Sequence, residues 1–66
     1  MTPREIKKIR LDLSLTQAEF ADAFGVLKKD LQNWEQGVRR PNRAATTLFK
    51  VIQFCPDAVR DAVAER

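Results

Sequence analysis

Two capping boxes of the form Thr-x-x-Glu constrain the fold of this sequence most, because each one marks a helix start. They are Thr2–Glu5, with proline at the first helical position, and Thr16–Glu19. In such a box the threonine and glutamate side chains satisfy backbone N–H groups that a helix start leaves unpaired. Gly25 can end the second helix in the left-handed conformation. The chain before Gly25 is therefore predicted to form two short helices.

Three more helices are predicted in the rest of the chain. One covers residues 27–36 and stops at Gly37, and Asn42 is a good N-cap for the next. Pro56 then opens a last helix over residues 57–65. Strand-period alternation, repeats and linkers are not seen. The predicted fold class is all-α, with a single five-helix domain over residues 1–66.

Composition argues against an enzyme. Histidine and tyrosine are absent, and the chain has one serine, Ser14, and one cysteine, Cys55. Few nucleophile–base pairs or zinc sites can be built from this set, so we expect no catalytic residues, no metal and no cofactor. A lone cysteine fits a reducing cytosol. With no signal segment and no apolar run near about 18 residues, we expect a cytoplasmic protein without a membrane segment.

Positive charge is concentrated in one part of the chain. Residues 27–50 contain six basic and two acidic residues, a net charge of +4, whereas the remainder has a net charge of −1. Such asymmetry is typical of proteins that bind polyanions, although a solvated charge cluster fits it equally well.

A helical wheel over residues 27–36 separates two faces. Leu27, Leu31 and Trp34 share the side expected to enter the core, with Trp34 as the largest anchor, and Asp30 and Glu35 lie on the flanks. The opposite face has no carboxylate and carries Lys28, Lys29, Gln32, Asn33 and Gln36. Lysine can donate to guanine, and the amides can pair with adenine. We expect this helix to read DNA bases rather than to be merely solvated.

Neighbouring residues are candidates for phosphate contacts. They are Gln17, Gln36, Arg39, Arg40 and Arg43. Two alternatives stay open here: Gln17 is simply solvated, or one of the two loop arginines pairs with Glu35.

Three motifs carry a family resemblance: Leu15–Ala21, Phe24–Val26 and Trp34–Pro41. Together they resemble the Cro/C1-type (Xre family) helix-turn-helix domain over residues 4–55. The segment 51–59 further resembles HigA- and MqsA-like antitoxins. The resemblance implies a lambda-repressor-like fold with its helix-turn-helix core at residues 16–36.

The resemblance also implies a function. The third helix would lie in the major groove of double-stranded DNA, with Lys28, Lys29, Gln32 and Asn33 facing bases. A homodimer would bind a palindromic operator, with half-sites about one helical turn apart. The expected protein is a bacterial or phage-encoded, nucleoid-associated repressor of its own operon, in a phage, anti-CRISPR or toxin–antitoxin context. The alternative is an interaction module that mainly binds a toxin.

Leu27 departs from the family pattern, which usually has serine or threonine at this N-cap. Leucine cannot cap, so the backbone donors need another partner, such as a DNA phosphate. Asp30 would compensate through the helix dipole.

The last helix offers an apolar strip made of Ala58, Val59, Ala62 and Val63, and Phe54 lies just before it. The predicted dimer contacts are Phe54, Val59, Ala62 and Val63. The alternative is that this strip packs on the first helix of the same chain.

Overall fold

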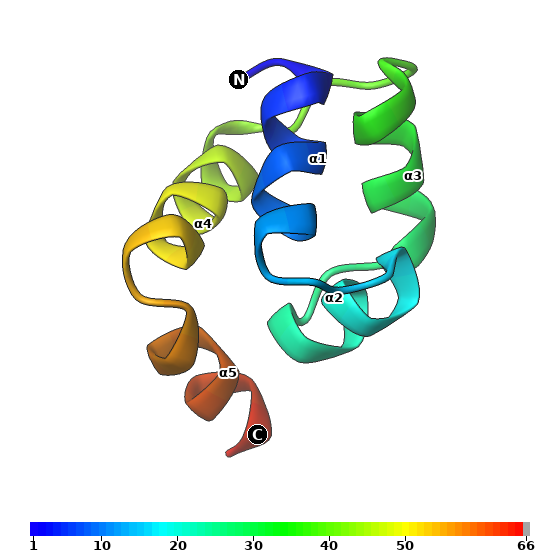
Figure 1. Ribbon diagram of the computed structural model, residues 1–66. Coiled ribbons are helices and arrows are strands. Elements are labelled where there is room, and N and C mark those ends of the chain that lie inside the picture. The colour runs from blue at the N-terminus through cyan, green and yellow to red at the C-terminus, as the bar shows by residue number, and fades with distance from the viewer. Residues whose placement is uncertain (66) are drawn as a thin grey trace.

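The computed structural model describes residues 1–65, and its five helices confirm the all-α prediction (Figure 1). They are α1 (Pro3–Asp12), α2 (Gln17–Phe24), α3 (Lys28–Gln36), α4 (Arg43–Phe54) and α5 (Pro56–Ala64). α1 stands between α3 and α4, and packs against both, while α2 and α5 close the lower end of the molecule in this view. None of these helices combines the length and apolar character needed to cross a membrane.

Side-chain caps fix where three of the helices begin. Thr2 and Glu5 form both hydrogen bonds of a capping box at 3.1 Å, and Thr16 and Glu19 repeat the arrangement at 2.9 and 3.1 Å. The backbone and side-chain hydrogen bonds from the threonines lower the pKa of both glutamates. Asn42 caps α4 by accepting a backbone N–H at 2.8 Å. These starts agree with the sequence prediction.

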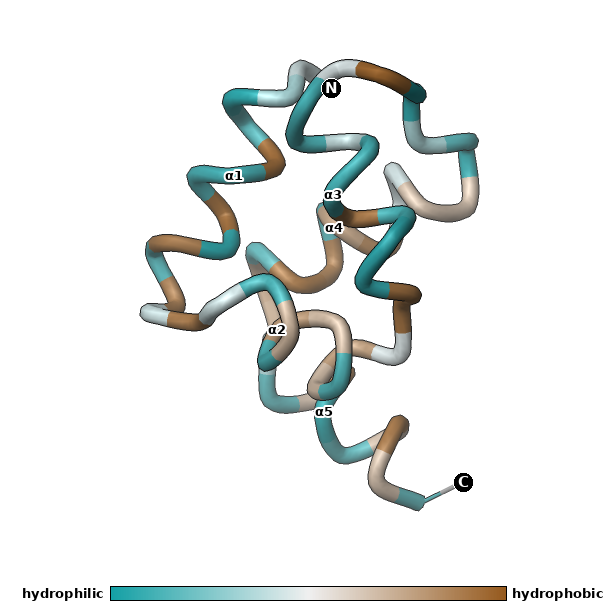
Figure 2. Tube along the Cα trace, turned by 90° about the vertical axis from the view of Figure 1, so that its right-hand side faces the viewer, coloured by the Kyte–Doolittle hydropathy of each residue, from teal (hydrophilic) through white to brown (hydrophobic). Residues whose placement is uncertain are grey.

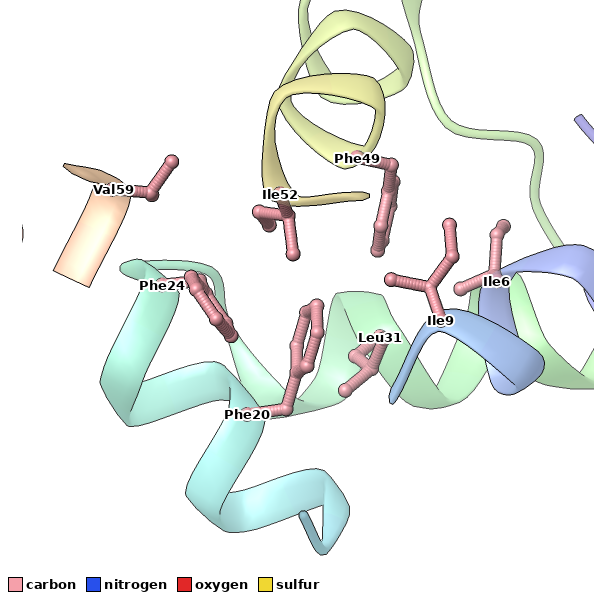
Figure 3. Close-up of a cluster of buried hydrophobic side chains, with 8 residues drawn as sticks. All are labelled: Ile6, Ile9, Phe20, Phe24, Leu31, Phe49, Ile52 and Val59. Atoms are coloured by element: carbon pink, nitrogen blue, oxygen red, sulfur yellow. The ribbon is translucent and has the colours of Figure 1, made fainter. Parts of the chain in front are cut away.

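The core gathers apolar side chains from all five helices (Figure 3). Its members are Ile6, Ile9, Phe20, Phe24, Leu31, Phe49, Ile52 and Val59. Phe20 is fully buried and contacts two rings, with its centroid 4.6 Å from that of Phe24 and 5.8 Å from that of Phe49. Trp34 is half-buried and packs edge-on against Phe49 at 5.6 Å. In α3, Leu31 rather than Trp34 is the fully buried anchor.

The prediction that Leu27 belongs to the core is wrong. Its side chain is 69% exposed. Leu27 is the N-cap of α3, with extended backbone angles (φ −78°, ψ 135°). A helical wheel assumes regular rotation per residue, and that rotation does not apply to a residue outside the helix.

The predicted dimer strip on α5 is also partly wrong. Val59 is 9% exposed and belongs to the core, and Val63 is half-buried against it. α5 packs mainly on α4 and α2, so its apolar side is used within the chain. The alternative prediction, that this side packs on the first helix, named α1 in the structure, is therefore not confirmed. Phe54 is 84% exposed and Ala62 is exposed, so these two remain available to a partner.

Candidate nucleic-acid interface

α2 and α3 form a helix-turn-helix arrangement with a very short connection. Gly25 ends α2 with φ 72°, a left-handed conformation that glycine adopts without steric cost. The N–H of Val26 then donates to the carbonyl of Ala21 at 3.1 Å, and α3 begins at Lys28. Because α2 and α3 pack directly on each other, the direction of α3 is set by the body of the domain.

A buried ion pair connects α1 to α3. The Nε and Nη2 atoms of Arg10 donate to the two carboxylate oxygens of Glu35 at 2.7 and 2.8 Å. Nη1 of the same arginine donates to the carbonyl of Leu15 at 2.9 Å. The two side chains are 10% and 5% exposed. The hydrogen bonds to Glu35 raise the pKa of Arg10, which therefore stays charged.

This pair corrects two expectations about the neighbouring side chains. Glu35 pairs with Arg10, so the alternative that Arg39 or Arg40 pairs with it is wrong. Gln17 is not simply solvated, because its Nε2 donates to a carboxylate oxygen of Glu35 at 3.3 Å. The amide of Gln17 is thus held in place, and its second N–H proton is left for another acceptor.

Arg10 is a structural residue that was not predicted from the sequence. The signal was present: Arg10 follows Ile9 and lies one helical turn beyond Ile6, and both isoleucines are buried. A charged residue on the apolar side of an amphipathic helix needs a buried partner.

The trace of α3 is largely hydrophilic in Figure 2. Lys28, Lys29 and Gln36 are exposed, and Gln32 and Asn33 are half-buried. Since Glu35 is withdrawn into its pair with Arg10, its carboxylate adds no exposed negative charge beside these residues. The lysines and amide side chains predicted for this helix therefore lie on one face of α3. Glu35, which flanks this face, is neutralised by Arg10.

The loop after α3 brings further basic residues alongside. Gly37 (φ 77°) ends the helix, with Val38 N–H donating to Asn33 O at 2.9 Å, the hydrogen bond typical of a Schellman motif. Arg39 and Arg40 follow and are exposed, as is Arg43 in the first turn of α4. Within residues 1–65 the ion pairs are Arg10–Glu35 and Lys8–Asp12, and neither involves these arginines or the lysines of α3.

Comparison with known proteins places this chain among antitoxins. Residues 1–62 match the family described as the antitoxin component of bacterial toxin–antitoxin system, MqsA. Antitoxin HigA-2 of Vibrio cholerae serotype O1 is 36% identical over 59 residues, which cover 89% of this chain and 57% of that protein. This chain thus spans little more than half the length of that relative. Both matches confirm the antitoxin resemblance seen in the sequence, and the chain belongs to the MqsA antitoxin family.

Proposed function

We propose that this protein is a sequence-specific DNA-binding repressor that acts as a homodimer on an inverted-repeat operator and regulates its own operon. The observation that carries the proposal is the outer face of α3. It combines exposed lysines with amide side chains while the buried Arg10 neutralises the nearby Glu35. A helix entering the major groove needs donors that reach base edges and few carboxylates that repel phosphate. With Glu35 paired, α3 keeps one other carboxylate, the half-buried Asp30.

Base reading is assigned to Lys28, Lys29, Gln32 and Asn33. The lysines stand at the N-terminal end of α3, the part of a recognition helix that approaches the base edges most closely. Their ammonium groups can donate to guanine O6 and N7. Gln32 and Asn33 lie about one turn further on and can pair with adenine through donor and acceptor together.

Phosphate contacts are assigned to the residues that border this face. Arg39 and Arg40 are exposed on the loop leaving α3, and Arg43 adds positive charge at the N-terminus of α4. Gln36 is exposed at the end of α3. Gln17, fixed by Glu35, has one amide proton left for a phosphate at the start of α2. These contacts would set the register of the protein without reading sequence.

The homodimer is assigned to the apolar surface around Phe54. This ring is 84% exposed, and Val51, one turn earlier on α4, is 42% exposed. An aromatic ring left in water favours a partner that covers it. A two-fold contact of this kind would present two copies of α3 to successive half-sites.

Selection of binding sites from random duplexes tests the proposal. The full chain is expected to enrich an inverted repeat with half-sites about one helical turn apart. Footprinting on the enriched duplex should show protection of both halves. Recovery of duplexes without any shared sequence, at a salt concentration near 0.15 M, would contradict sequence-specific binding.

A toxin is the second candidate partner, because the chain belongs to an antitoxin family. An interaction module would bind that toxin whether or not it bound DNA. Co-expression with the product of the adjacent gene, followed by size-exclusion chromatography, separates the two functions. A stable complex from a chain that selects no DNA would favour the interaction module.

A further inference from the structure

Leu27 is an unexpected residue at the start of α3. Three other helices have an N-cap residue whose side chain accepts a hydrogen bond from a backbone N–H. These N-caps are Thr2, Thr16 and Asn42. Neither Leu27 at the start of α3 nor Cys55 at the start of α5 forms such a bond. Serine, threonine, aspartate and asparagine are strongly preferred at an N-cap, and leucine is among the poorest residues there.

The leucine side chain is not needed by the fold either. It is 69% exposed, while Leu31 in the same helix is fully buried. Leucine at a position where a small polar residue would cap the helix lowers stability through the missing cap. Because most of its side chain stays in water, burial of this leucine contributes little to offset that loss. A contact outside the domain would account for the residue.

We propose that Leu27 is a specificity-determining residue that contacts the 5-methyl group of a thymine in the operator. This inference rests on the proposed DNA-binding function. Leu27 directly precedes Lys28, at the end of α3 that would approach the base edges. Its side chain has no hydrogen-bonding atom. Among the four bases, thymine is the one that presents an apolar group in the major groove, its 5-methyl group.

The assignment gives α3 two kinds of base contact. Lys28 and Lys29 supply donors for guanine. Leu27 supplies an apolar surface that favours thymine over cytosine at a base pair next to those guanines. The residue thus exchanges helix stability for base discrimination.

Replacement of single thymines by deoxyuridine isolates this contact, because the exchange removes one methyl group and keeps base pairing. The duplex is the one that the wild-type protein selects, and affinity is measured by fluorescence anisotropy. At one thymine in a half-site, the wild-type protein should lose about fourfold in affinity on the exchange. Leu27→Ala should bind the thymine and deoxyuridine duplexes equally.

Leu11→Ala is the matched control, because Leu11 is also an exposed leucine, at 53%, and lies on α1. It should retain the fourfold discrimination. Thermal melts of both variants check that the domain stays folded. Equal wild-type affinity for every exchanged duplex, or unchanged discrimination by Leu27→Ala, would overturn the role of Leu27 while leaving operator binding intact. Failure to select any duplex would instead refute the proposed function, and this inference with it.

Discussion

Arg10 of α1 holds the carboxylate of Glu35 on α3 through two hydrogen bonds of 2.7 and 2.8 Å. The pair has a structural role, since it ties the first helix to the third across the domain. It also has an electrostatic consequence, because it neutralises a carboxylate next to the basic face of α3. The same carboxylate orients Gln17 at the start of α2. One buried ion pair therefore joins three elements on which the candidate interface depends.

Removing one partner of this pair should destabilise the domain strongly. Arg10→Met or Glu35→Leu leaves a charge without its partner at a site that is at most 10% exposed. Each is expected to cost about 3–5 kcal/mol, a large part of the stability of so small a domain. Urea unfolding followed by circular dichroism measures the loss.

The double variant Arg10→Met/Glu35→Leu serves as the control for that experiment. It removes both charges, so it should recover much of the stability lost in each single variant. If the single variants lie within about 0.5 kcal/mol of the wild-type protein, the pair is not the structural link described here.

Truncation should affect two leucines, Leu31 in α3 and Leu27 at its start, to very different extents. Leu31→Ala opens a cavity in the core and should cost about 2–5 kcal/mol. Leu27→Ala should change stability by less than about 0.5 kcal/mol, because its side chain is mostly in water. Leu27→Ser should raise stability by about 1 kcal/mol through a new N-cap. Urea denaturation of the three variants compares them, and a large loss for Leu27→Ala would show that this side chain is buried in solution.

Local sequence signals were enough to predict the helices. The two capping boxes, Asn42 and the glycines at 25 and 37 mark helix ends through short-range hydrogen bonds and backbone conformation, which depend on a few adjacent residues. Periodicity over residues 27–36 then placed Leu31 in the core. The polar face of α3 could be predicted in the same way, since residues 28–36 form a regular helix.

What the sequence did not reveal depends on distant contacts or on irregular backbone. Arg10 and Glu35 are far apart in the chain, and no local pattern connects them. The burial of Val59 and Val63 could not be predicted, because the packing of α5 on α2 is not encoded in α5 alone. The exposure of Leu27 could not be predicted from a helical wheel, because its extended backbone departs from the helical rotation.

Acid should weaken the domain through its capping boxes. Hydrogen bonds from Thr2 and Thr16 lower the pKa of Glu5 and Glu19 below the ordinary value of 4.5. Their contribution to stability is therefore present above that value and is lost as the pH falls through the lower folded-state pKa. Urea unfolding at a series of pH values should show this decline. The double variant Glu5→Gln/Glu19→Gln keeps the capping boxes but has no carboxylate to titrate there, so it should lose less stability in acid than the wild-type protein. The same dependence of stability on pH in both proteins would argue against the capping boxes as the cause.

Self-association should depend on Phe54. Phe54→Ser removes an aromatic ring that is 84% exposed, so the monomer fold should survive. Analytical ultracentrifugation is expected to show a dimer for the wild-type chain and a monomer for the variant, with similar circular dichroism spectra. Leu11→Ser, on α1, is the control and should leave the dimer intact. A dimer that persists in Phe54→Ser would place the interface elsewhere.

Titration of variants against the selected operator and a scrambled duplex, at several salt concentrations, tests the central claim most directly. Gln32→Ala and Asn33→Ala should each lose about 1–3 kcal/mol on the operator and little on the scrambled duplex. Arg39→Ala, Arg40→Ala and Arg43→Ala should weaken both duplexes alike and lower the salt slope by about one per contact. If Gln32→Ala and Asn33→Ala leave the preference for the operator unchanged, α3 is not the reading helix.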